Sequence, residues 1–345
     1  MLGNEVKYFI KDVIRNPRSG LDWVGTRVAY ALRWKKVPFL PVAIDIEPNN
    51  TCNFKCTHCQ VTYWDKKPAY FNSEIFVKVL KQIPNLMKVK LQGMGEPLLN
   101  KQLIPMLQAG EQQGVRMHFH TNGSISDPIK ANQLAQLDRT HITYSIDGAT
   151  AGTFTQMRPG SRFNQIVENI QMLMSKRRSG SNLLVSAWTV VTQKNVHELP
   201  QIIQLAKKLG LDFIAIQPYL TSWGKEDMES HTNDIQVTTA SDTFASQLAT
   251  AKATATDAGI DLIVNEYSRF CRDKPCAWAW KSAFIAANGD VVPCCVVADS
   301  DVVKMGNVFE QDFKEIWNSS AYQELREQII NHDLPEYCKN CYVDP

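Results

Sequence analysis

The stretch TCNFKCTHCQ, residues 51–60, places three cysteines close together directly after a strand-like apolar stretch. Their spacing is Cys52-x3-Cys56-x2-Cys59. Three thiolates this close fit one face of a [4Fe–4S] cluster, because each cluster iron takes tetrahedral sulfur ligation. The fourth iron is then open to another ligand. A structural zinc ion is the alternative, but it needs a fourth protein ligand. His58 is a poor one, because its side chain would point elsewhere if both neighbouring cysteines bind one metal.

Outward from this loop, strand and helix patterns alternate along the chain. Six strand-like segments are each followed by a short connection and a helix-like segment. This order predicts an α/β fold with a parallel sheet and helices outside it, either a partial barrel or a doubly wound sheet. In both architectures, ligands bind at the carboxyl ends of the strands. The predicted strands are 42–47, 88–92, 116–121, 141–146, 183–191 and 212–217. The predicted helices between them are 73–83, 102–113, 128–137, 163–178 and 196–209.

The composition is that of a globular protein without a strong charge. The chain has 345 residues, of which 44% are hydrophobic, and 37 Lys and Arg stand against 35 Asp and Glu. This near balance argues against nucleic acid as a partner, because nucleic-acid binders carry a basic surplus. No apolar run approaches the roughly 18 residues of a membrane span. Residues 1–16 are charged and amphipathic, unlike a secretory signal. We therefore expect a cytoplasmic protein.

The nine cysteines form two groups, because residues 60–270 contain none. Disulfides are not expected in a reducing cytosol, so this distribution indicates two thiolate sites. Four well-spaced cysteines of the second group can hold a structural zinc ion or a second [4Fe–4S] cluster. Cys271 and Cys295 are left over, and an ordinary buried thiol is the favoured interpretation of both. The four predicted ligands are Cys276, Cys294, Cys338 and Cys341.

The first cysteine motif resembles the cluster motif of the radical S-adenosylmethionine (SAM) superfamily. The resemblance implies that SAM binds the open iron, that an electron from the cluster cleaves SAM, and that the resulting 5′-deoxyadenosyl radical abstracts a substrate hydrogen. The segment GMGEP, residues 93–97, resembles the family's glycine–glutamate segment, which holds the SAM amino group. Its glycines allow a close backbone approach. A bidentate arginine contact suits the SAM carboxylate. The SAM contacts implied in this way are Gly93, Gly95, Glu96, Ser145 and Arg158.

The second cysteine group resembles the SPASM/twitch extension of the same superfamily, which binds auxiliary clusters. Four ligands match the shorter twitch form with one cluster, and the pattern is most like that of the radical SAM dehydrogenase of butirosin biosynthesis. The resemblance therefore implies two [4Fe–4S] clusters in all. We expect four segments: an N-terminal helical extension at 1–39, a partial (βα)6 parallel barrel at 40–220, a connecting segment with a helix at 221–260, and a small cysteine-rich SPASM/twitch domain at 261–345.

The expected function is that of a radical SAM oxidoreductase. An auxiliary cluster near the substrate suits a net two-electron oxidation, such as the dehydrogenation of a small molecule in a biosynthetic pathway. A peptide substrate that is cross-linked, converted to a thioether or epimerised is the first alternative, and a noncatalytic iron–sulfur or zinc scaffold is the second. The family chemistry also requires a reductant, such as flavodoxin or ferredoxin. The sequence does not identify the substrate.

Overall fold

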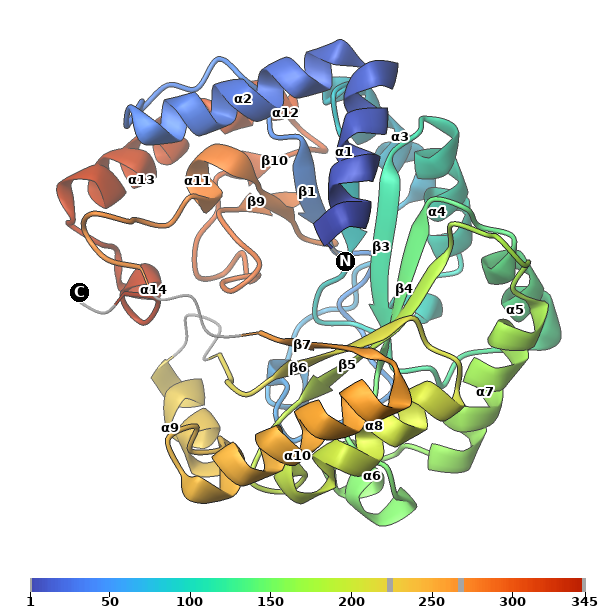
Figure 1. The fold of residues 1–345 in the computed structure, drawn as a ribbon. Helices are drawn as coiled ribbons and strands as arrows, with labels where there is room; N and C mark the ends of the chain where they lie inside the picture. Colours follow the sequence, from blue (N-terminus) through green and yellow to red (C-terminus); the bar gives the residue numbers. More distant parts are fainter. Residues whose placement is uncertain (1, 222–225, 266–269, 343–345) are drawn as a thin grey trace.

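Seven parallel strands form the core of the molecule. They are β1 (Ala43–Ile46), β2 (Lys88–Leu91), β3 (Arg116–Thr121), β4 (Thr140–Ser145), β5 (Leu184–Val190), β6 (Phe213–Gln217) and β7 (Asp261–Val264). The computed structural model describes residues 2–221, 226–265 and 270–342, and in it these strands are neighbours in chain order. They lie side by side in a curved sheet (Figure 1), and β7 is the last strand at one edge of that sheet. The predicted α/β partial parallel barrel is confirmed.

Helices connect the strands and cover the outer face of the sheet (Figure 1). Their apolar sides face the strands, as in α3, where Phe76, Val79 and Leu80 are buried. Asn72 caps α3 by accepting hydrogen bonds from two backbone N–H groups of its first turn. The helices are α3 (Ser73–Gln82), α4 (Leu103–Gln112), α5 (Pro128–Ala135), α6 (Ala151–Met157), α7 (Phe163–Lys176) and α8 (Leu199–Lys208).

The parallel sheet continues beyond the six predicted strands. Helices α9 (Glu226–Ile235) and α10 (Asp242–Ala258) follow β6, and β7 then pairs in parallel with β6. The sequence boundary at residue 261 therefore falls at the start of a barrel strand, and α10 packs beside α8. The side chains of β7 are mostly half-buried and show no alternation, so the strand lacks the period-two signal that marks β1 and β2.

The C-terminal part is joined to the first strand of the barrel. Strand β8 (Phe284–Ile285) pairs in parallel with β1, and β9 (Asp290–Val292) and β10 (Gly306–Asn307) extend the same sheet in antiparallel fashion. One ten-stranded sheet therefore runs through both parts of the chain. The helices around this edge are α11 (Trp278–Lys281), α12 (Phe313–Trp317), α13 (Ser320–Asn331) and α14 (Glu336–Lys339).

Two N-terminal helices, α1 (Leu2–Arg15) and α2 (Pro17–Ala31), pack against the rest of the molecule. Asp12 of α1 is buried and forms ion pairs with Arg116 at 3.0 Å and Arg139 at 2.5 Å, at the start of β3 and just before β4. On α2, the Tyr30 hydroxyl donates a hydrogen bond to the carbonyl of Pro275. These contacts tie the extension to the amino ends of the strands and to the C-terminal part.

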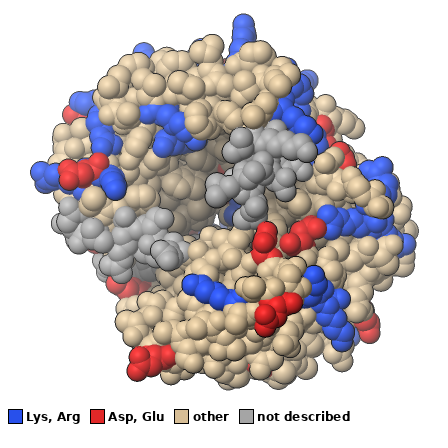
Figure 2. Space-filling view, in the orientation of Figure 1, with Lys and Arg blue, Asp and Glu red and all other residues tan. Residues whose placement is uncertain are grey.

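Charged side chains of both signs are interspersed on the face shown in Figure 2, around a hollow near its centre. Within the described residues, no helix is long and apolar enough to cross a membrane.

Candidate active site

The first three cysteines lie together in the loop that follows β1. Cys56 is buried, and Cys52 and Cys59 are half-buried. Burial raises the pKa of Cys52 to about 11 and that of Cys59 to about 12, and the neighbouring thiolates contribute to both shifts. The three sulfurs are therefore close enough to repel one another as thiolates. A cationic iron cluster removes this repulsion, so the donor set fits the predicted first cluster.

Behind this loop lies a buried ion pair between Arg158 and Asp147. One Arg158 nitrogen is 2.6 Å from the Asp147 carboxylate, and another donates to the Cys56 sulfur at 3.6 Å. Burial alone would lower the pKa of Arg158, but the Asp147 carboxylate and the Cys56 thiolate outweigh it and raise that pKa. Arg158 thus stays charged beside the cysteine loop. Its expected contact with the SAM carboxylate remains a prediction.

His58 points toward Asp147. Its Nε2 atom lies 3.6 Å from the carboxylate. Burial lowers the pKa of His58 to about 4 despite the opposing effect of Asp147, so the imidazole is neutral near pH 7. Asp147 also accepts a hydrogen bond from the backbone N–H of Val190 at 2.9 Å. The sequence assigned no contact to Asp147, although its position after β4 marks it as a strand-end residue.

The glycines after β2 are required by close contact between two loops. A Cβ atom on Gly93 would lie 2.3 Å from the Glu47 side chain, and one on Gly95 would lie 2.2 Å from the backbone oxygen of Asn49. The N–H of Met94 also donates to Glu47 at 2.8 Å. Only glycine permits this approach, which brings the GMGEP segment against the start of the cysteine loop.

Glu96 connects the ends of two neighbouring strands. Its carboxylate accepts hydrogen bonds from the Thr121 hydroxyl at 2.7 Å, the Asn122 N–H at 2.7 Å and the Leu98 N–H at 3.0 Å. The side chain is buried, and burial raises its pKa while these donors oppose the shift. Glu96 therefore orders the loops after β2 and β3 in addition to any contact with SAM. Ser145, the last residue of β4, lies half-buried opposite Trp188 of β5.

The four predicted auxiliary ligands also come together. Burial raises the pKa values of Cys276 and Cys294 to about 12, and Cys341 contributes to both shifts. Burial likewise raises the pKa of Cys338, with added effects from Cys294, Cys276 and Cys341. These mutual effects place the four sulfurs in one group, as a four-thiolate cluster site requires.

The two remaining cysteines differ in their surroundings. Cys271 lies in a short turn with Lys274. Cys295 packs in a small apolar cluster with Met94 and Phe284, close to the first cysteine loop. Burial raises the pKa of Cys295, and the nearby Asp45 carboxylate on β1 raises it further. Cys295 therefore packs beside the first cysteine loop and also raises the pKa of Cys276, whereas its neighbour Cys294 belongs to the auxiliary group.

Neither cysteine group has the geometry of a single-ion site. Among the residues that the structure describes, no three His, Cys, Asp or Glu side chains are arranged to hold one metal ion. The thiolates of a [4Fe–4S] cluster each bind a different iron, so they lie further apart than the ligands of one ion. Both donor sets are compatible with clusters.

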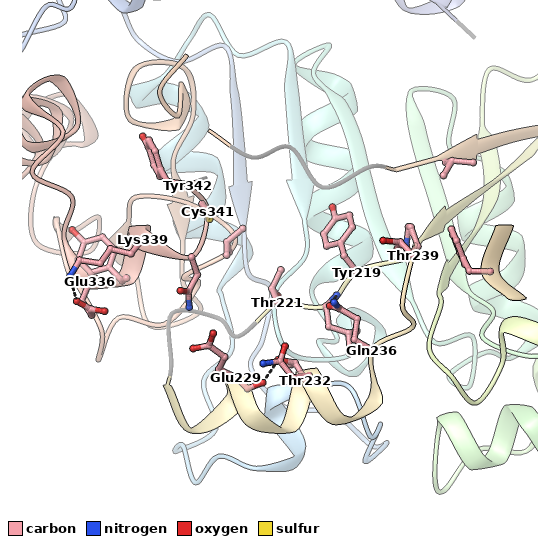
Figure 3. Close-up of a pocket in the computed structure, with 18 of the residues that line it drawn as sticks. Tyr219, Thr221, Glu229, Thr232, Gln236, Thr239, Glu336, Lys339, Cys341 and Tyr342 are labelled. Atoms are coloured by element: carbon pink, nitrogen blue, oxygen red, sulfur yellow. Dashed lines mark hydrogen bonds and ion pairs between the residues drawn. The ribbon is translucent and has the colours of Figure 1, made fainter. Parts of the chain in front are cut away.

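A cavity of about 900 Å³ opens between the barrel and the C-terminal part. Its barrel wall comes from the segment after β6, with Tyr219 and Thr221, and from Gln236, which follows α9. Cys341 and Tyr342 form part of the opposite wall (Figure 3). The cavity therefore borders the auxiliary cysteine group. This cavity could not be predicted from the sequence, because its walls come from segments far apart in the chain.

Comparison with known proteins identifies the two parts. Residues 46–206 match the family model of the radical SAM superfamily, and residues 276–342 match that of SPASM, an iron–sulfur cluster-binding domain. An AdoMet-dependent heme synthase of Methanosarcina barkeri is 25% identical over 80% of this chain and 82% of its own. A PqqA peptide cyclase of Gluconobacter oxydans is 24% identical over 88% and 84%.

The fold is shared with solved structures at lower identity. SuiB of Streptococcus suis, solved bound to its precursor peptide SuiA, aligns with a TM-score of 0.67 at 16% identity, over 87% of this chain and 69% of its own. The two domains confirm the predicted cofactors, [4Fe–4S] clusters and SAM. Residues 46–206 therefore form a domain of the radical SAM superfamily, and a SPASM domain follows it at residues 276–342.

Proposed function

We propose that this enzyme carries out a net two-electron oxidation at a substrate carbon. When bound, SAM and the first cluster would supply the radical that takes a hydrogen atom from the substrate, and the auxiliary cluster would accept the electron that the substrate radical then loses. The substrate then loses a proton to solvent or to a protein base, so that atoms and electrons balance. The products are 5′-deoxyadenosine, methionine and a substrate lacking a pair of hydrogens.

The observation that carries this proposal is the position of the auxiliary cysteine group beside the cavity. Four thiols in one group leave no iron open, so the site suits electron transfer rather than substrate ligation. Cys341 belongs to that group and also lines the cavity. A substrate in the cavity would therefore lie next to the electron acceptor.

A small molecule that undergoes dehydrogenation is the first candidate substrate. A peptide is the second, and two observations favour it. A volume of about 900 Å³ is near the upper end of the range of small-molecule pockets, so it also has room for a short peptide segment. The relatives also include PqqA peptide cyclases, and SuiB was solved with a precursor peptide. Formation of a cross-link in a peptide is the same two-electron oxidation.

Anaerobic turnover tests the proposal. The reconstituted enzyme is incubated with SAM and dithionite, first alone and then with fractionated metabolites or with short peptides. We expect 5′-deoxyadenosine in all cases and, with the true substrate, a product lighter by two hydrogens in mass spectra. A product of unchanged mass with altered stereochemistry would contradict the oxidation and support epimerisation instead.

A further inference from the structure

Polar side chains line the interior of the barrel below the cysteine loop. Strand pairing sets Asp45 of β1 opposite Lys90 of β2, Lys90 opposite His118 of β3, and His118 opposite His141 of β4. These residues alternate with buried apolar neighbours that face the helices, such as Ile44, so they point inward. Four adjacent strands therefore contribute one polar layer to the barrel interior.

Three imidazoles are packed together here: His118 and His141 belong to this layer, and His120 follows two residues later on β3. The rings of His118 and His141 stack with centroids 4.1 Å apart, and the His120 ring lies 4.8 Å from that of His118. His118 Nε2 is hydrogen-bonded to the Thr143 hydroxyl at 2.9 Å, and His141 Nε2 to the Ser186 hydroxyl at 2.7 Å. These bonds fix the orientation of two of the rings.

Two nitrogens of this group have no partner among the described residues. They are Nδ1 of His118 and Nε2 of His120, both removed from solvent. The His118 residue is only 8% exposed. Leaving a buried polar atom unpaired costs free energy, so both atoms are available to pair with a bound group. Burial, together with nearby cations, lowers the pKa of both imidazoles well below the usual range, so each is neutral and retains one N–H.

Lys90 supplies a positive charge to the same space. Its ammonium acts electrostatically on Cys295, and both it and the ammonium of Lys88, two residues earlier on β2, act on Asp45 and on all three imidazoles. No ion pair engages it within the described part of the chain. The three imidazoles are not arranged to hold a metal ion. A charged donor and two neutral N–H donors match the oxygens of an anion better than any cation.

We propose that this group, called here the barrel carboxylate site and formed by Lys90, His118 and His120, binds a carboxylate of the substrate. Lys90 contributes the ion pair, and the two imidazoles contribute N–H donors in the tautomers that carry the hydrogen on Nδ1 of His118 and on Nε2 of His120. That the bound carboxylate belongs to the substrate rests on the proposed function. The site lies inside the same barrel whose strand ends carry the first cysteine loop. Cys295, next to the auxiliary ligand Cys294, is within electrostatic reach of Lys90, so the site also lies near the second cysteine group.

Ligand-observed saturation-transfer NMR on the SAM-bound holoenzyme tests this assignment without turnover. The probes are propionate and propionamide, which have the same shape and differ in charge. We expect propionate to bind at least roughly tenfold more tightly than propionamide, as a charged hydrogen bond implies. Lys90→Met should abolish that preference, Lys90→Arg should keep it, and Lys101→Met, at an exposed position, should leave it unchanged.

Equal binding of the two probes by the wild type would overturn the assignment, as would a preference that survives in Lys90→Met. Iron content and SAM affinity verify that each variant is folded. If Lys90→Met does not fold, His120→Phe provides the same comparison, because it keeps a planar ring and removes the Nε2 donor. An enzyme that binds propionate through Lys90 but oxidises no substrate would contradict the proposed function alone.

Discussion

At the scale of single residues, Glu96 and Glu111 make the same kind of network at opposite ends of the barrel. Glu96 accepts two backbone N–H groups and a threonine hydroxyl at the carboxyl ends of β2 and β3. Glu111 accepts the N–H groups of Asp138 and Arg139 and the hydroxyl of Thr140 at the start of β4. Replacing either glutamate should therefore cost stability, whereas only replacement of Glu96, at the cluster end of the barrel, should also affect SAM binding.

The first prediction concerns Glu96→Gln. The amide NH2 would face a backbone N–H, so the free energy of unfolding should fall by about 1–3 kcal/mol. SAM affinity should also fall by roughly tenfold or more, because a charged partner of the SAM ammonium is lost. Chemical denaturation and SAM titration measure the two effects. Glu111→Gln is the matched control and should lose stability only. An unchanged SAM dissociation constant in Glu96→Gln would reduce Glu96 to a structural role.

The sequence predicted Glu96 from its place after two glycines, but not its partners. Thr121 and Asn122 lie about 25 residues further along the chain, and nothing local to Glu96 indicates them. The same holds for Asp147, whose partner Arg158 is placed by the fold of α6. Motif spacing identifies the residues at strand ends, whereas the contacts between strand ends depend on how the sheet curves.

At the scale of elements, the approach of the GMGEP segment to the cysteine loop determines whether the site forms. Gly95→Ala would place a methyl group within 2.2 Å of one backbone oxygen and 2.6 Å of another. Backbone cannot yield as a side chain does, so we expect a loss of at least about 1–3 kcal/mol of stability and weaker SAM binding.

Gly152→Ala provides the control for this substitution. Gly152 lies in α6, and its Cβ would meet nothing within 4 Å. Alanine there should raise stability by up to about 1 kcal/mol, because it favours the helix. Thermal unfolding of both variants gives the comparison. Equal stability of Gly95→Ala and the wild type would show that the two loops separate without cost.

Helix α1 is held by a buried carboxylate, which leads to a third prediction. Asp12→Ala removes the partner of both Arg116 and Arg139. The two arginine side chains are about one-quarter exposed, so water replaces part of the lost interaction, and we expect a loss of about 1–3 kcal/mol. Asp257→Ala, an exposed site on α10, should be neutral. Proteolysis should begin earlier within residues 2–31 of Asp12→Ala, and resistance equal to that of the wild type would contradict the anchoring role.

The elements with strong periodicity were the ones that the sequence predicted well. All six predicted strands are present, with ends that differ by a residue or two. Strand β7 was not predicted, because its four residues show no alternation. The pairing of β8 with β1 could not be predicted either, since a strand of two residues is too short to show a periodic pattern.

At the scale of the whole molecule, one sheet fixes the two cysteine groups relative to each other. The first group follows β1, and β8, which pairs with β1, leads to the segment that contains Cys294. Helix α2 strengthens this link, since Tyr30 bonds to the carbonyl of Pro275, next to Cys276. Movement of one group relative to the other would require breaking this pairing, so their separation should be constant during turnover.

The fourth prediction tests whether the two groups are independent despite this link. Replacing Cys52, Cys56 and Cys59 together by alanine should remove about half of the roughly eight irons per chain and abolish SAM cleavage. Iron analysis and 5′-deoxyadenosine assays measure both effects. The remaining iron should keep the spectrum of a four-thiolate cluster. Formation of 5′-deoxyadenosine by this variant would contradict the assignment of the first cluster.

The last prediction separates the roles of the two groups. Cys294→Ala removes one auxiliary ligand and leaves the first loop unchanged, so SAM cleavage should continue while net oxidation of the substrate stops. The enzyme would then consume SAM without releasing oxidised product, and the ratio of 5′-deoxyadenosine to product should rise steeply. Cys271→Ala is the control, because Cys271 is not among the main groups that raise the pKa of Cys276, Cys294 and Cys338. Loss of the auxiliary cluster in Cys271→Ala would show that the ligand set was chosen wrongly. If anaerobically purified protein holds zinc instead of iron at the auxiliary group, that group cannot accept an electron. This result would contradict its proposed role as electron acceptor.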